Sequence, residues 1–171
     1  MQSSRLFPFA TIVAAATAIA LTALPWMSLR PVGFDVSWNG LGMGGLAGVD
    51  DFAPAGRGWL VIAASIVAIL AALISLMPAV QAQPVARLAN AAAAVVCVLG
   101  AFVPVAVMIW PGWYSNNVLD QVGLVPFGTE LGPSKAVLIP LTVVMLLTAA
   151  LCAYSATDRG REERDVWSPL T

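Results

Sequence analysis

The sequence predicts an all-α membrane protein, a bundle of four transmembrane helices with a small extracytoplasmic β-hairpin or sheet cap. Four apolar runs, residues 6–24, 59–77, 88–110 and 136–154, contain none of the eight basic and nine acidic residues of the chain. Each run has 19 to 23 residues, which at about 1.5 Å per residue spans a hydrocarbon core of roughly 30 Å. A period-two pattern in the loop after the first run predicts the strand.

The composition agrees with this class. The 171 residues are 60% hydrophobic and 10% charged, whereas soluble domains carry about 25% charged residues. We therefore expect one transmembrane domain over residues 1–171. Arg5 and the small residues Ala18 and Ala20 would also suit a secretory signal, but the run is long for one, and we interpret it as a retained first span.

The distribution of charge predicts the orientation. Four spans place both termini on one side, with Arg5, Arg87, Arg159, Arg161 and Arg164, against Arg30, Arg57 and Lys135 on the other. The excess favours cytoplasmic termini in a multi-pass protein of the bacterial inner membrane. The outer loops would then be residues 27–58 and 111–135, and residues 156–171 would form a cytoplasmic tail.

The first outer loop carries the strand pattern. Apolar and polar residues alternate over residues 32–39, and Asn39-Gly40 follows as a hairpin turn signal. The return arm, residues 41–49, is rich in glycine and predicts a poor strand. Residues 117–125 of the second outer loop predict another short strand.

Small residues predict close helix packing inside the spans. The candidates are Ala14, Ala18, Gly100 and Pro104, and Pro104 should kink the third span or free a backbone carbonyl. An apolar groove opened by small residues and this kink could hold an acyl chain.

The chain lacks the residues that most catalytic sites need. The chain has no histidine, which excludes His-ligated haem, His metal sites and Ser-His triads. Cys97 and Cys152 lie inside spans and are expected to be small buried hydrophobes. Asp35, Asp50 and Asp51 could bind a divalent cation, but such acids are more often solvated, and we predict no catalytic, cofactor or metal site.

Tryptophans gather on the predicted outer side. Trp26, Trp59 and Trp110 lie at span ends, which is typical of an interfacial belt. Four aromatic residues of the loops and tail are candidates for a partner interface: Phe34, Trp38, Trp113 and Trp167.

Two resemblances follow from these features. The four spans, the longer first outer loop and the Trp38-Asn39-Gly40-Leu41 segment resemble the claudin plan, although the claudin cysteine pair has no counterpart in this loop. The Ala- and Val-rich spans and Leu24-Pro25-Trp26 resemble small four-span actinobacterial membrane proteins. That resemblance implies an accessory subunit of an envelope assembly, such as a lipid importer of the mammalian-cell-entry type or a respiratory supercomplex.

The expected function is a non-catalytic accessory subunit of a larger inner-membrane complex, with lipid transport favoured over respiration. The partners would be that complex and the bilayer, and no nucleic acid. The alternatives are a small membrane enzyme using Asp35, Asp50 or Asp51, and a lipid-binding protein using a groove between helices.

Overall fold

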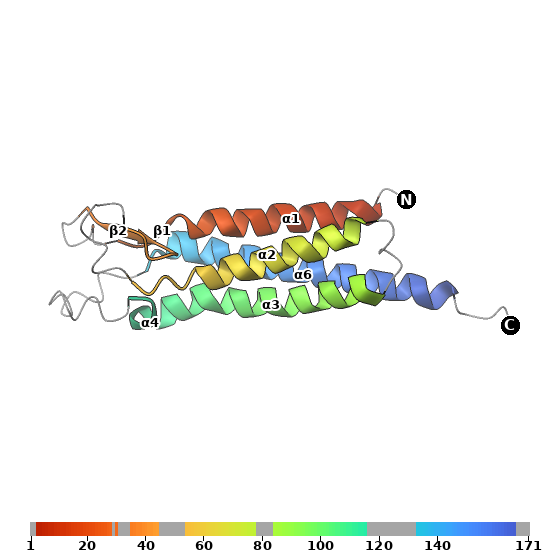
Figure 1. The fold of residues 1–171 in the computed structure, drawn as a ribbon. Coiled ribbons are helices and arrows are strands. Elements are labelled where there is room, and N and C mark those ends of the chain that lie inside the picture. Colours follow the sequence, from red (N-terminus) through yellow and green to blue (C-terminus); the bar gives the residue numbers. More distant parts are fainter. Residues whose placement is uncertain are drawn as a thin grey trace.

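The computed structural model describes residues 3–28, 30, 35–44, 54–77, 84–115 and 133–166, and it places side chains within residues 6–157 of these ranges, except at Ser115. Its elements are α1 (Ser3–Thr22), β1 (Pro25–Ser28), β2 (Ser37–Asn39), α2 (Trp59–Leu76), α3 (Pro84–Ile109), α4 (Pro111–Ser115) and α6 (Lys135–Val166). The four long helices run side by side, and the two strands and α4 lie together at one end of the bundle (Figure 1).

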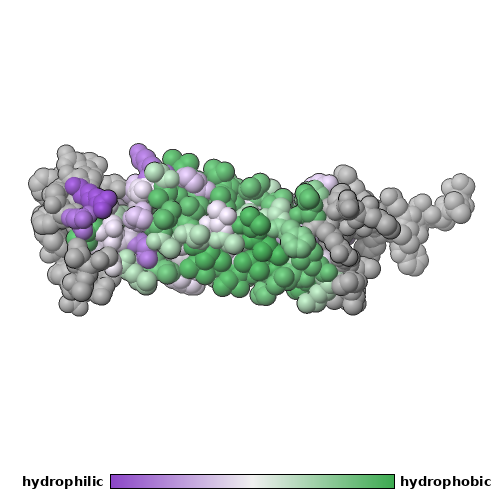
Figure 2. All heavy atoms as spheres, turned by 90° about the horizontal axis from the view of Figure 1, so that it is seen from above, coloured by the Kyte–Doolittle hydropathy of each residue, from purple (hydrophilic) through white to green (hydrophobic). Residues whose placement is uncertain are grey.

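The predicted bundle of four apolar helices is confirmed. Within the described residues, three helices are long and apolar enough to cross a membrane, in α2, in α3 and in Lys135–Thr157 of α6, and the apolar part of α1, Leu6–Thr22, is shorter. Apolar side chains cover the middle of the bundle in one view, and the polar ones gather toward the end that carries the strands (Figure 2). The chain is therefore a multi-pass membrane protein.

The observed helix ends differ from the ends of the predicted spans, because a helix does not have to begin and end where its apolar run does. α1 stops at Thr22 instead of residue 24, because Pro25 biases the residue before it toward extended backbone. α2 ends in the same way, with Met77 extended before Pro78. α3 starts four residues before its apolar run, and α6 continues to Val166. A helix can extend beyond its apolar run, because its backbone hydrogen bonds do not depend on the hydrophobicity of the side chains.

Small side chains fill the bundle interior. Ala15 and Ala18 of α1, Ala68 of α2 and Ala93 of α3 are fully buried. The contact between α3 and α6 is the most extensive in the structure. Because no hydrophobic force drives helices together in lipid, such close packing is a principal source of their association.

Hydrogen bonds between side chains also join helices. Asn90 of α3 donates from Nδ2 to Ser75 Oγ of α2 at 2.8 Å, and both residues are buried. The same amide also donates to the Ala86 carbonyl. Buried polar pairs of this kind stabilise helix association by about 0.6–2 kcal/mol.

The predicted antiparallel sheet is present, but the main partner of its strand differs from the expected one. β2 pairs with β1, which precedes it, with Met27 opposite Trp38 and Ser28 opposite Ser37. A turn follows Asn39, but it is longer than the predicted two-residue Asn39-Gly40 turn: Asn39 is the last residue of β2, and its amide donates to the Met43 carbonyl. Asn39 Oδ1 accepts the Leu41 and Met43 amides. The glycine-rich return arm contributes one isolated bridge, Trp38 to Gly44, in the part described. The strand predictions for residues 117–125, 32–34 and 45–49 lie outside the described residues.

Candidate functional site

A compact cap closes one end of the bundle; it comprises β1, β2, the turn 40–44, residues 54–58, α4 and residues 133–134. Its interior is aromatic. Trp26, Trp38 and Tyr114 are each at most 3% exposed, and the rings of Trp26 and Tyr114 lie 5.8 Å apart. The prediction that Trp26 belongs to an interfacial belt is therefore wrong, because the chain turns back after Thr22 and folds this ring inward.

Backbone hydrogen bonds tie the cap to the end of α1 and join the cap segments that adjoin the other long helices to one another. The Gly40 amide donates to the Thr22 carbonyl at the end of α1, and Gly58, next to α2, donates to the Gly40 carbonyl at 2.7 Å. The Ala55 amide donates to Tyr114 O of α4, and Ser134, next to α6, donates to Trp26 O at 2.8 Å. The helix ends are thus held in register by segments far apart in the sequence.

Glycine allows these segments to approach. A Cβ at Gly58 would lie 2.7 Å from the carbonyl carbon of Gly40, and a Cβ at Gly40 would lie 2.7 Å from the Trp26 ring. Neither position has space for a side chain, so the glycines are required where the first loop crosses the start of α2.

Tyr114 links α4 to the hairpin. Its hydroxyl donates to the Asn39 carbonyl, and burial raises the pKa of Tyr114 above its ordinary value of 10.0. The raised pKa means that the unfolded chain releases this proton first. The contribution of Tyr114 to stability is therefore complete below pH 10.0 and is lost as the pH rises toward the folded-state pKa.

We expect the wild-type cap to loosen in alkaline solution and a Tyr114→Phe variant not to show this transition. The variant lacks the hydroxyl and should be about 1 kcal/mol less stable at neutral pH. Thermal unfolding followed by tryptophan fluorescence from roughly pH 8 to 11 checks both points. An equal alkaline loss in both proteins would contradict the role of Tyr114.

A cationic rim borders the cap where α2 begins. The Arg57 guanidinium carbon lies 5.0 Å from the centre of the Trp113 ring, a cation–π distance. Trp59 and Trp110 are 55% and 69% exposed, so both remain candidates for the predicted interfacial belt. Lys135, also exposed, starts α6 at the same end of the bundle.

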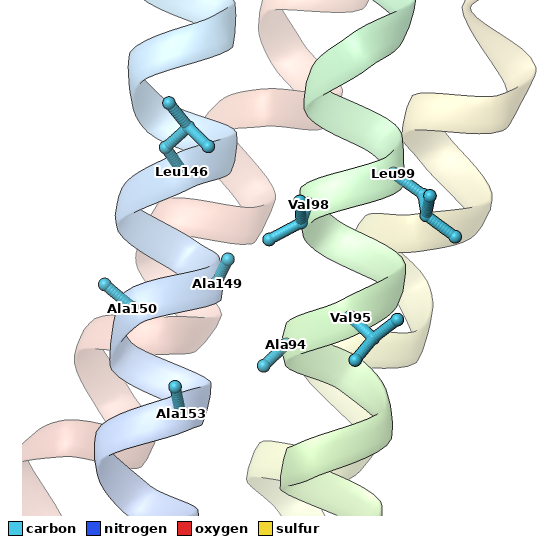
Figure 3. A pocket seen from close by; sticks show the side chains of 8 residues that line it. All are labelled: Ala94, Val95, Val98, Leu99, Leu146, Ala149, Ala150 and Ala153. Atoms are coloured by element: carbon cyan, nitrogen blue, oxygen red, sulfur yellow. The ribbon is translucent and has the colours of Figure 1, made fainter.

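An apolar groove runs between α3 and α6. It has a volume of about 420 Å³ and is lined by Ala94, Val95, Val98, Leu99, Leu146, Ala149, Ala150 and Ala153. Ala94 and Val98 lie on the side of α3 toward α6, opposite Ala149 (Figure 3). The lining on α3 ends at Leu99, so Pro104 does not line this groove. Pro104 is buried, and α3 continues through it to Ile109.

The predicted packing residues all lie in the interior. Ala14, Ala18, Gly100 and Pro104 are buried, and Gly100 faces Met145 of α6 and Ala64 of α2.

The structure separates the predicted interface residues. Trp113 is 39% exposed on the rim, whereas Trp38 is 3% exposed inside the cap. A role of Trp38 in partner binding would therefore act through the fold of the cap. Phe34 and Trp167 lie outside the described residues.

The acidic candidates are only partly visible. Asp35 forms an exposed ion pair with Arg30 at 2.7 Å, and Asp50 and Asp51 lie outside the described residues. Within the described ranges, no three His, Cys, Asp or Glu residues lie close enough together to hold a metal ion. Both cysteines are buried and unpaired with each other, as predicted.

Sequence reasoning missed Tyr114 and Asn90. Tyr114 follows Trp113 in a loop, and nothing local distinguishes the buried ring from the exposed one. Asn90 had a signal, because an amide inside an apolar run needs a partner in lipid.

Comparisons with known proteins identify no relative: no family model matches this chain, and no curated protein or solved structure matches it. The groove, the cap and the rim are therefore the features from which we infer a function.

Proposed function

We propose that this protein is a non-catalytic accessory subunit that stabilises a larger complex of the bacterial inner membrane. The observation that carries the proposal is the groove between α3 and α6, an open apolar surface with small side chains on both walls. Ala94, Ala149 and Ala153 would let the backbone of another helix approach closely, which is how helices associate in lipid. The occupant would be a transmembrane helix of the partner.

The apolar spans support a structural role. Pumps and ion-coupled transporters place ionisable side chains at membrane depth, and the four apolar runs contain no Asp, Glu, Lys or Arg. The cap supports the same role, because its hydrogen bonds hold the helix ends in one arrangement. A preorganised docking surface loses little entropy on binding.

The process and the orientation are further parts of the proposal. The resemblance to small actinobacterial four-span proteins favours a lipid-transport complex over a respiratory one. The excess of arginine in residues 5, 87 and 159–164 favours cytoplasmic termini. The cap would then face the extracytoplasmic part of the partner, with Trp113 on its exposed rim.

A pull-down of the chromosomally tagged protein in mild detergent, with mass spectrometry, tests the proposal. We expect stoichiometric recovery of large transmembrane subunits. Ala153→Phe, which fills the groove, should lower that recovery about tenfold, equivalent to about 1.4 kcal/mol. Leu73→Phe is the matched control, because Leu73 is 43% exposed on α2, away from the groove.

A second candidate, a lipid-binding protein, is favoured by the same volume of about 420 Å³, since an acyl chain is also apolar and elongated. Recovery of the protein alone, with lipid released by Ala153→Phe, would contradict the accessory subunit and support this candidate. Trp38→Ala and Phe34→Ala test the cap separately: unchanged partner recovery in both would exclude an interface that depends on it.

A further inference from the structure

Arg57 lies at the depth of the lipid headgroups. It precedes α2 by two residues, and the 18 residues of α2 span about 27 Å at 1.5 Å per residue. The hydrocarbon core is roughly 30 Å thick, so a charge just outside α2 falls at its boundary. The exposed indoles of Trp59 and Trp110, which begin α2 and follow α3, mark the same level.

The guanidinium of Arg57 is held but its hydrogen bonding is incomplete. Trp113 covers one face of it at 5.0 Å. Its Nε atom is buried and has no hydrogen-bond partner among the described residues, while the Arg57 side chain as a whole is only half-buried at the rim. The ion pair found within the described residues is Arg30 with Asp35, and it does not involve Arg57.

A half-buried guanidinium that has no carboxylate partner among the described residues suits an anionic ligand. The guanidinium presents a planar fork of donors that matches the oxygens of phosphate, and Arg–phosphate bonds are charge-assisted. Phospholipid headgroups supply phosphate at the depth where Arg57 lies.

We propose that Arg57 binds the phosphate of a phospholipid headgroup in the leaflet on the cap side, with Trp113 as the positioning residue. Stacking on Trp113 restricts the guanidinium to the rim, where its terminal nitrogens face the headgroup layer. Inorganic phosphate shares this chemistry, so it serves as a competitor in the test. The site does not depend on a protein partner and stands apart from the proposed function.

Native mass spectrometry of the full-length protein, titrated with phosphatidylglycerol, tests the site. Arg57→Gln should weaken lipid binding about tenfold, because it removes the charge and the donors that would bind the phosphate. Arg57→Lys should lie between, since it keeps the charge and loses the fork. Lys135→Gln, which removes an exposed charge at the same end, should bind as the wild type does.

Several outcomes would overturn the proposal. Unchanged binding by Arg57→Gln, or an equal loss with Lys135→Gln, would show diffuse attraction instead of a site. Displacement of the lipid by millimolar inorganic phosphate would assign the site to a free anion. Loss of a co-purified protein without loss of lipid would assign Arg57 to a partner carboxylate.

A second variant serves as a control for misfolding of Arg57→Gln. Trp113→Leu keeps the charge of Arg57 and removes the face that positions it, and it should weaken phosphatidylglycerol binding about threefold, less than 1 kcal/mol. If Arg57→Gln is not monodisperse, this variant and Arg57→Lys decide the question. Wild-type affinity in both would refute the site.

Discussion

Replacing Gly56 by alanine is expected to lower the stability of the protein by about 2–5 kcal/mol. Gly56 has φ +59°, a conformation that costs an L-residue about 1–2 kcal/mol. Its Cβ would also overlap the Leu41 carbonyl oxygen and lie 2.7 Å from the carbonyl carbon. Gly42 has the reciprocal arrangement, with φ +80° and the Pro54 oxygen against its Cβ position. The segments around Gly42 and Gly56 therefore cannot cross at this distance if either glycine is given a side chain.

Thermal unfolding in mild detergent, followed by tryptophan fluorescence, measures this effect. The buried indoles of Trp26 and Trp38 report directly on the cap. We expect the midpoint to fall by on the order of 10 °C for Gly56→Ala. Gly112→Ala is the matched control, because Gly112 is exposed within α4 and helical backbone accepts alanine. Equal midpoints for Gly56→Ala and the wild type would show that the crossing does not hold the cap together.

Replacing Gly100 by leucine is expected to separate α3 from its neighbours inside the membrane. A Cβ at Gly100 would lie 2.6 Å from Met145 Cε of α6 and 2.9 Å from Ala64 Cβ of α2. The methionine end can move, but Ala64 has no flexible atoms, so α2 itself must shift. Overpacking of this kind costs about 1–3 kcal/mol, and the helices lose the contact that small residues provide.

Unfolding of the purified protein by increasing proportions of SDS in mixed micelles measures the change. Ala91→Leu adds similar bulk on the exposed side of the same helix and should leave the transition in place. A wild-type transition for Gly100→Leu would mean that α2 and α6 accommodate the side chain without loss. A shift in both variants would point to bulk on α3 in general instead of the buried contact.

The cap shows where prediction from sequence reached its limit. The strand around Trp38 and a turn beside Asn39 follow local rules; the strand is confirmed, and the turn is present but longer than the predicted two residues. The return strand was expected in the glycine-rich arm, residues 41–49, whereas the structure pairs β2 with Pro25–Ser28. That pairing depends on Trp26 packing against Tyr114 and on Trp26 O accepting the Ser134 amide. These contacts join residues about ninety or more positions apart, so no local pattern contains them.

The candidate sites divide in the same way. Small residues at Gly100 and Ala18 predicted close packing, because in lipid a glycine or alanine inside a span has few other uses. The sequence could not tell that Trp38 is buried and Trp113 exposed, since both are tryptophans in the predicted outer loops. Arg57 was recognisable as a charge at the end of a span, but its stacking on Trp113 and its incomplete hydrogen bonding are visible only in three dimensions.

The sequence by itself determined that the chain forms a bundle of apolar helices, because the exclusion of charge from long runs is a property of composition alone. It also determined the turn at Asn39, since a side-chain amide that bonds its own neighbouring backbone is a local interaction. Only the tertiary structure decided which strand pairs with β2, where α3 and α6 leave a groove, and which aromatic ring covers Arg57. Those features come from contacts between helix ends and loops that are distant in sequence, and their energies depend on shape and distance that residue types do not specify.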